Sequence, residues 1–128
     1  MPNRGLRGAT TVNSNTRDAI IDGTTELLQQ LIDANGIKED DVAFALFTTS
    51  PDLNAEFPAV AARQMGWNTT ALMCGHEMNV PGSLQKCIRI LISWNSEKKQ
   101  SEINHIYLRG AKVLRTDLEN SKNSRGAK

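Results

Sequence analysis

The most regular pattern of hydrophobic and polar positions along the chain lies between residues 17 and 35. Apolar side chains recur there at the three- and four-residue spacing of one helix face, and Gly23 and Thr24 continue that face through its middle. The apolar members are Ala19, Ile20, Leu27, Leu28, Leu31 and Ile32. Residues 13–16 offer several side chains that can cap a helix start, and residues 35–36 are types that tolerate the left-handed conformation at a helix end. The segment therefore predicts an amphipathic helix.

Shorter apolar runs predict strands and a second helix. Residues 42–48 form a compact apolar run that is typical of a buried strand. Residues 84–94 fit either a helix or a buried strand, but three isoleucines at even spacing favour a strand from about Cys87. The remaining elements are expected as strands at residues 3–12, 69–74 and 103–108, and as a short helix at residues 57–65 with Pro58 in its first turn.

The order of these elements indicates the fold class. Strands that alternate with helices are typical of an α/β or α+β domain with a mixed sheet and flanking helices. No repeat or internal boundary divides the chain, so residues 1–118 are expected to form a single domain. Residues 119–128 are polar, and we expect them to form a mobile tail in the free protein.

Composition and charge narrow the functional classes. Hydrophobic residues make up 39% of the 128 residues and charged residues 23%, a mix typical of globular proteins. The formal net charge of +1 creates no global field for nucleic acid or anionic lipid, so neither is an expected partner. No apolar run approaches the roughly 20 residues that span a bilayer, and the N-terminal residues lack the apolar core of a signal peptide. We therefore expect a cytoplasmic protein.

The sequence carries no motif for nucleophilic, metal or cofactor chemistry. Cys74 and Cys87 form no CxxC pair, which fits a reducing compartment, and His76 beside Cys74 gives too few ligands for a metal site. The chain has no GxSxG, P-loop, HExxH or Rossmann fingerprint. We therefore expect no metal and no cofactor, and arginine-based electrostatics are the better supported chemistry.

Two arginines lie in unusual sequence surroundings. Arg89 lies inside the apolar run CIRILISW, where a buried guanidinium is costly unless it is paired. That run offers no carboxylate, so a partner would come from elsewhere in the fold or from a ligand; a strand whose arginine face meets solvent explains the pattern about equally well. Arg7 lies among Gly5, Gly8 and Ala9, which leave a guanidinium room beside a ligand, although a surface strand is the commoner explanation.

Glu77 and Tyr107 are weaker candidates. Glu77 follows a predicted strand and precedes a Pro-Gly loop, where it could contact a ligand, although most acids in loops are solvated. Tyr107 is the only tyrosine and lies in a short apolar strand. Its hydroxyl needs a partner if it is buried, and a backbone acceptor would serve as well as a ligand. Spacing alone leaves both alternatives open.

Four blocks of sequence, taken together, resemble the monofunctional AroH-class chorismate mutases. The blocks are RGLRGATTV, SPDLNAEFPAVAAR, CGHEMNVPGSLQKCIRI and IYLRGAKVLRTDL, and the resemblance covers residues 4–118. Four blocks in order, at nearly the family spacing, are far more specific than one short motif. The resemblance implies an isomerase that converts chorismate to prephenate, on the route to phenylalanine and tyrosine.

The resemblance also implies an architecture and a set of site residues. Members of the family are homotrimers in which mixed sheets with flanking helices form a pseudo-barrel, with three active sites at the subunit interfaces. The segment from Phe57 to Arg63 would face the other site residues across an interface, and Phe57 and Leu114 would exclude water. By matching motif, the site residues are Arg7, Phe57, Ala59, Arg63, Met73, Cys74, Glu77, Arg89, Tyr107, Leu114 and Arg115.

The implied reaction assigns a role to the charged residues. In this pericyclic rearrangement the ether oxygen of the substrate gains negative charge, which a rigid guanidinium at Arg89 would stabilise. Arg7 and Tyr107 would clamp the side-chain carboxylate and hold the compact conformer. Glu77 would stabilise positive charge on the ring and accept a hydrogen bond from its hydroxyl, with Cys74 assisting at that hydroxyl.

The chain departs from the family pattern at two places. Val60 stands where some members carry a basic residue, which leaves Arg63 and Arg115 to steer the substrate. The segment RQMGW is one residue shorter than the family form. A small-metabolite sensor on a similar trimer and an imine-hydrolysing trimer with a carboxylate-binding arginine stay open as alternatives. A sensor would need the arginines but not the acid at Glu77.

Overall fold

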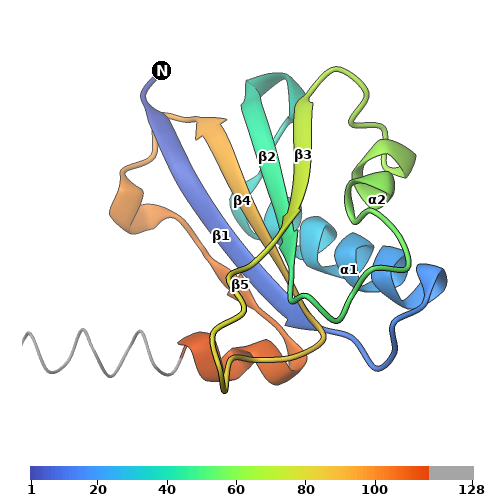
Figure 1. The fold of residues 1–128 in the computed structure, drawn as a ribbon. Helices are drawn as coiled ribbons and strands as arrows, with labels where there is room; N and C mark the ends of the chain where they lie inside the picture. Colours follow the sequence, from blue (N-terminus) through green and yellow to red (C-terminus); the bar gives the residue numbers. More distant parts are fainter. Residues whose placement is uncertain (116–128) are drawn as a thin grey trace, which may run out of the picture.

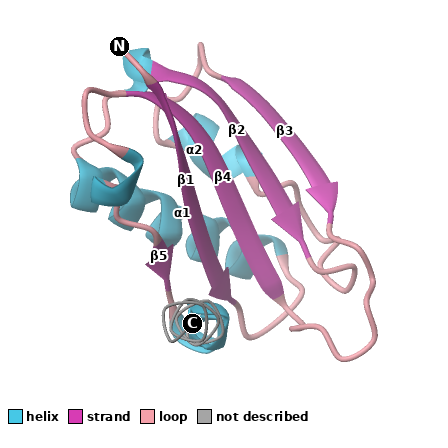
Figure 2. Cartoon of the chain, turned by 90° about the vertical axis from the view of Figure 1, so that its left-hand side faces the viewer, coloured by secondary structure: helices cyan, strands magenta, loops and turns pink. Residues whose placement is uncertain are grey.

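A computed structural model describes residues 1–115, so the tail predicted at residues 119–128 lies outside the described residues. The described chain is a five-stranded mixed sheet with helices α1 and α2 on one face (Figures 1 and 2). The sheet order is β3-β2-β4-β1-β5, which confirms the expected α+β class. The elements are β1 (Asn3–Thr11), α1 (Arg17–Asn35), β2 (Val42–Thr49), α2 (Ala59–Gln64), β3 (Ala71–His76), β4 (Cys87–Asn95) and β5 (Ile106–Tyr107).

Helix α1 begins and ends where its capping residues predict. The Thr16 side chain accepts a hydrogen bond from the Ala19 backbone N–H at 3.2 Å, which satisfies a donor that the first turn leaves free. Gly36 adopts the left-handed conformation with φ 72°, and its N–H donates to the Ile32 carbonyl. The apolar face between these caps packs on the sheet, as the spacing predicted.

Strand β4 lies at the centre of the sheet. It pairs antiparallel with β1 on one side and with β2 on the other, whereas β2 with β3 and β1 with β5 are parallel pairs. Its three isoleucines are at most 2% exposed and point toward α1, so the ambiguous segment is a strand, as their even spacing favoured. Arg89 and Leu91 therefore point to the opposite face of the sheet, which α1 and α2 leave uncovered (Figure 2).

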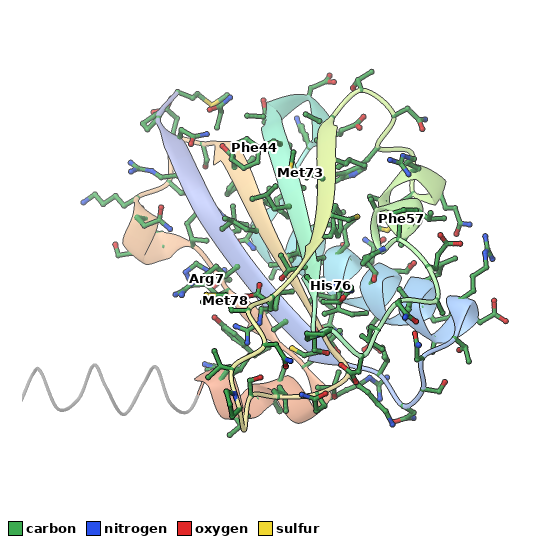
Figure 3. All side chains as sticks on the ribbon, viewed as in Figure 1. Arg7, Phe44, Phe57, Met73, His76 and Met78 are labelled. Carbon is green, nitrogen blue, oxygen red and sulfur yellow. The ribbon has the colours of Figure 1, made fainter. Side chains whose placement is uncertain are left out.

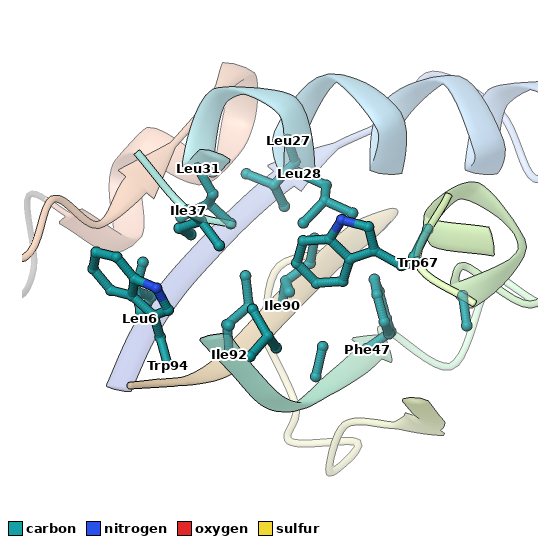
Figure 4. Packing of buried hydrophobic residues seen from close by; sticks show 14 of the residues in the cluster. Leu6, Leu27, Leu28, Leu31, Ile37, Phe47, Trp67, Ile90, Ile92 and Trp94 are labelled. Atoms are coloured by element: carbon teal, nitrogen blue, oxygen red, sulfur yellow. The ribbon is translucent and has the colours of Figure 1, made fainter. Parts of the chain in front are cut away.

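The hydrophobic core lies between the sheet and the two helices (Figure 4). Leucines of α1 pack against β2 and β4, and Trp67 closes the side next to α2. Gly8 of β1 lies directly under α1, because a Cβ at this position would come within 2.8 Å of the Leu31 Cδ1 atom. The glycine therefore permits the close approach of strand and helix.

The last strand is shorter than predicted. The prediction covered residues 103–108, but β5 contains only Ile106–Tyr107, because only Gly8 and Ala9 of β1 pair with it. Ile103 lies outside the sheet and is buried in the core instead. The apolar character of the predicted strand therefore reflects core packing as well as sheet pairing.

Strands β2 and β3 also differ in detail from the expectation. The β2 segment was predicted to be buried, but only one of its faces is, and Phe44 is 40% exposed on the other. A register irregularity between Val42 and Phe44 accompanies this change of face. Strand β3 covers Ala71–His76, two residues later than residues 69–74, so that its end brings the following turn beside the end of β2.

Candidate active site

A cavity of about 560 Å³ opens on the uncovered face of the sheet. Its volume is in the range of pockets that bind small metabolites. Five of the residues assigned by resemblance line it together, and Gly8, Ala9, Leu46, Thr48, Ile90 and Leu91 complete the wall. The five assigned residues are Arg7, Glu77, Arg89, Tyr107 and Leu114.

The floor of this cavity follows from strand register. Ala9 of β1 pairs with Arg89 on one side and with Tyr107 on the other, and Arg89 in turn pairs with Thr48. Residues directly opposite each other in neighbouring strands project from the same face, so these four side chains form a row across the sheet. The small Ala9 side chain lies between the guanidinium and the phenol. The row therefore supplies two polar groups on either side of one small residue.

Arg89 is half-buried with an unused donor. Its Nε atom is buried and makes no hydrogen bond to any residue that the structure describes. A buried donor without a partner costs about 1–3 kcal/mol, so the site is favourable only if something else accepts from it. Burial raises the pKa of the neighbouring Cys87 thiol, although the charge of Arg89 and a hydrogen bond from it act to lower that pKa. Cys87 therefore provides no thiolate partner for the guanidinium. An acceptor for the Arg89 Nε–H would therefore come from outside the described residues, and an anionic group would suit the guanidinium charge.

Glu77 reaches the cavity from the turn after β3. Its backbone N–H donates to the Thr49 carbonyl at 2.8 Å, and its carboxylate Oε2 accepts from the Thr48 hydroxyl. The same carboxylate and Arg89 also line a smaller hollow of about 270 Å³ that continues toward Cys87. Sequence reasoning missed Thr48, because nothing in its local sequence shows that it lies opposite Arg89 in the sheet.

Arg7 lies at the rim of the cavity and is exposed in the single chain. Its backbone N–H donates to the Nδ1 atom of His105 at 3.0 Å, which ties β1 to the segment that carries Tyr107. Burial, together with the nearby charge of Arg7, lowers the pKa of His105 below its ordinary value of 6.5. A neutral imidazole with its proton on Nε2 fits this acceptor role.

The remaining candidates do not join this cavity within one chain. Phe57 and Cys74 line a separate hollow of about 300 Å³ next to α2. Cys74 pairs in the sheet with the buried Phe47, so its thiol points to the helix-covered face. Burial raises the pKa of Cys74, although a hydrogen bond from the Ala59 backbone N–H and the charge of Arg63 act to lower it. One chain therefore does not place Cys74 and Glu77 in one cavity.

Four other assigned residues also lie apart from the cavity, and one of them, Ala59, is buried in α2. Met73 is 66% exposed on the open face and pairs with Leu46, while Phe57, 67% exposed, lies beside α2 (Figure 3). Arg63 is exposed on α2. Arg115, the last residue that the structure describes, is exposed and does not line the cavity, although the adjacent Leu114 does.

The loop that presents Phe57 is held from the start of α1. The Asn15 side chain accepts from the backbone N–H groups of Asn54 and Ala55, each at 3.0 Å, and donates to the Asn54 side chain at 2.8 Å. The Glu56 carboxylate accepts from the backbone N–H of Phe57 at 2.8 Å. An exposed aromatic ring is thus fixed on an ordered loop, as expected for a surface that contacts another molecule.

Two further observations concern metal binding and membrane-spanning helices. Among residues 1–115, no three His, Cys, Asp or Glu side chains gather in a way that could hold a metal ion. Within the same residues, no helix has the length and apolar character needed to cross a membrane.

Comparisons with known proteins identify relatives of the whole chain. The family model "Chorismate mutase type I" matches residues 3–118. The chorismate mutase AroH of Thermus thermophilus is 45% identical over 119 residues, 92% of this chain and 98% of that protein. The corresponding protein of Bacillus subtilis is 43% identical over 122 residues, 94% of this chain and 96% of that protein.

A solved structure agrees with these relatives. The chorismate mutase from Clostridium thermocellum is 52% identical and superposes with a TM-score of 0.84, covering 85% of this chain and 97% of that one. Both the fold and nearly the whole sequence therefore match. The chain belongs to the type I chorismate mutase family.

Proposed function

We propose that this chorismate mutase rearranges its substrate in the cavity around Arg89 and that it works as a homotrimer with sites completed by a neighbouring subunit. The observation that carries the proposal is the cavity itself, in which four widely separated residues meet. They are Arg7, Glu77, Arg89 and Tyr107. The reaction, chorismate to prephenate, belongs to the biosynthesis of phenylalanine and tyrosine.

The chemistry of this reaction needs only placement and charge. One carbon–oxygen bond of the substrate breaks while one carbon–carbon bond forms, so no proton transfer and no covalent intermediate is required. An enzyme accelerates such a step by holding the compact reactive conformer and by stabilising charge that develops in the transition state. The cavity offers fixed cationic and acidic groups on an apolar wall, which suits both tasks.

Arg89 would stabilise the developing negative charge. Its Nε is buried, has no described partner and is held on a central strand, so it needs little reorganisation when an oxyanion forms. Arg7 at the rim and the Tyr107 hydroxyl, on the other side of Ala9 from Arg89, would hold the side-chain carboxylate. The conformer would thereby be fixed with its ether oxygen over the Arg89 guanidinium.

Glu77 would stabilise the opposite, positive charge. The ring of the substrate gains partial positive charge in the transition state. The Glu77 carboxylate, which lies beside Thr48 on the β2 side of Arg89, would stabilise that charge. In the trimer that we propose, Cys74 and Phe57 of the neighbouring subunit would close the site over the ring. Burial holds the Cys74 thiol in its neutral form, in which it can donate a hydrogen bond to a substrate oxygen.

The open face of the sheet supports assembly with further copies. Phe44, Leu91 and Met73 are 40%, 40% and 66% exposed, and register places them around Leu46. A contiguous apolar patch of large side chains on a sheet face is unfavourable in water and marks an interface. We propose that a second copy of this chain covers the patch. The Phe57 loop and the Arg89 cavity lie on different sides of one chain, so a neighbouring copy could bring its Phe57 loop to the cavity. Repeating that contact around a threefold axis closes a ring.

The proposal extends to the cell compartment. Both described cysteines are free, with Cys87 buried and Cys74 partly buried. Free thiols persist in a reducing environment, which supports a role in the cytoplasm.

Incubation of the purified protein with chorismate tests the proposed function. We expect loss of chorismate, prephenate as the product identified by NMR, and a mass of three chains by light scattering. Binding of chorismate without turnover would refute the enzymatic function and favour the metabolite sensor. An active species with the mass of one chain would refute the shared site.

A further inference from the structure

Thr48 carries a contact that the assigned residues alone do not explain. It lies on β2 opposite Arg89, on the open face, and lines the same cavity. Its hydroxyl donates to the Oε2 atom of Glu77 rather than to a backbone carbonyl. A threonine on a strand usually satisfies its hydroxyl with water or backbone, so this use of the single hydroxyl proton is specific.

The position of Glu77 depends on few other contacts. Its backbone is tied to Thr49 by one hydrogen bond, and the residues that follow it pack weakly, with Met78 and Val80 exposed by 81% and 54%. Within residues 1–115 no cation forms an ion pair with the carboxylate. Among residues 1–115, the Thr48 hydroxyl is therefore the one side-chain group that hydrogen-bonds to the Glu77 carboxylate and orients it.

We propose that Thr48 is a positioning residue that aims Glu77 at the substrate ring. The proposal rests on the function proposed above for Glu77. Thr48 occupies one carboxylate oxygen and leaves the other, Oε1, free to face the cavity. The hydroxyl also restricts rotation of the acid, so the carboxylate is in place before the ring charge develops. Thr48 acts through Glu77 and need not touch the substrate.

Substitution by valine tests this role, because valine keeps the branched shape and removes the donor. We expect Thr48→Val to lower kcat about ten- to hundredfold, the range for a hydrogen bond to a charged group. KM should change less than about threefold, since the interaction with Glu77 grows mainly in the transition state. Thr48→Ser keeps the hydroxyl and should retain kcat within about threefold.

A matched control separates this effect from the general loss of a threonine–glutamate contact. Thr70 donates to Glu39 at 3.0 Å, outside the lining of the cavity. Thr70→Val removes a bond of the same kind and should leave kcat unchanged. Thermal unfolding of each variant establishes that it is folded under the assay conditions.

A double-mutant cycle with Glu77→Ala decides whether Thr48 acts through Glu77. In that background, Thr48→Val should lower kcat by no more than about twofold, because the acid it would position is gone. Independent, multiplicative losses in the double variant would overturn the proposal, as would a Thr48→Val variant with the kcat of wild type. If Glu77→Ala alone keeps the wild-type kcat, the role proposed for Glu77 fails as well. If Glu77→Ala lowers kcat but Thr48→Val does not, only the inference about Thr48 is overturned.

Discussion

Replacement of Arg89 by lysine isolates the geometry of the guanidinium from its charge. Lysine keeps one positive charge on a similar stem but lacks the Nε donor and the planar fork. In this chain the Nε is buried and has no described partner, so we expect the substrate to supply its acceptor. Loss of one preorganised donor of this kind costs about 2.7–4 kcal/mol in the transition state, which corresponds to about 10²–10³ in kcat.

The structure also indicates that the Arg89→Lys variant folds. The Nε makes no internal hydrogen bond that the substitution would break, and the contact to Cys87 involves a neutral thiol. We therefore expect the melting temperature to change by only a few degrees while kcat collapses. A fall in activity that tracks a fall in stability would instead point to a structural role for the arginine.

Steady-state kinetics of chorismate consumption is the appropriate assay. Arg4→Lys provides the control, because Arg4 lies on β1, donates from its Nε to the Lys98 carbonyl at 2.7 Å, and does not line the cavity. The control should keep the wild-type kcat. An Arg89→Lys variant with kcat within about threefold of wild type, less than 1 kcal/mol of barrier, would refute the role assigned to Arg89.

Three further expectations concern residues around the site. Gly8→Ala brings a Cβ within 3.0 Å of two leucine methyls of α1 and should lower the free energy of unfolding by about 1–3 kcal/mol in chemical denaturation, whereas Gly5→Ala, with nothing within 4 Å, should not. Burial lowers the pKa of His105 and favours its neutral form, so the stability that neutral His105 contributes is present above pH 6.5 and is lost as the pH falls below that value. Chemical denaturation of wild type and His105→Gln at about pH 7 and about pH 5 measures this loss. Asn15→Ala frees the loop that carries Phe57 and should raise KM for chorismate more than it lowers kcat.

Each expectation has an outcome that contradicts it. Equal stability of the two glycine variants would show that α1 does not pack tightly on Gly8. A stability difference between wild type and His105→Gln that stays constant with pH would show that the imidazole does not titrate as described. For the loop, Asn68→Ala is the control, since Asn68 is exposed and lies outside the contacts of Asn15. Equal KM values for the two asparagine variants would contradict a role of the clamp in substrate binding.

Local signals predicted the helices well because their boundaries are local. Thr16 and Gly36 cap α1 through hydrogen bonds to residues three and four positions away, so sequence neighbours carry the information. The short β5 was overpredicted for the opposite reason. Its length is set by how far Gly8 and Ala9 of a distant strand can pair with it, and the apolar residues upstream serve the core instead.

The site was predictable only in part. The sequence surroundings of Arg7 and Arg89 showed two unusual cations but left a surface role open, and the family resemblance supplied a set of residues of which one chain brings five into the cavity. Thr48 and Ala9 escaped notice because their importance comes from register opposite Arg89, which no local pattern encodes. Short sequence distance is also no guide to whether Cys74 and Glu77 share a cavity within one chain, because strand alternation directs the Cys74 thiol to the helix-covered face of the sheet.

Mixed trimers test most directly the claim that each site is shared between subunits. One variant, Arg89→Ala, lacks the cavity half of the site, and a second, Phe57→Ala combined with Arg63→Ala, lacks the half on the loop and α2. Each should be inactive alone. After the two are unfolded together and refolded at equal amounts, about one site in four should unite two intact halves, which restores about a quarter of the wild-type kcat/KM. Activity no higher than the mean of the two parents would contradict a shared active site.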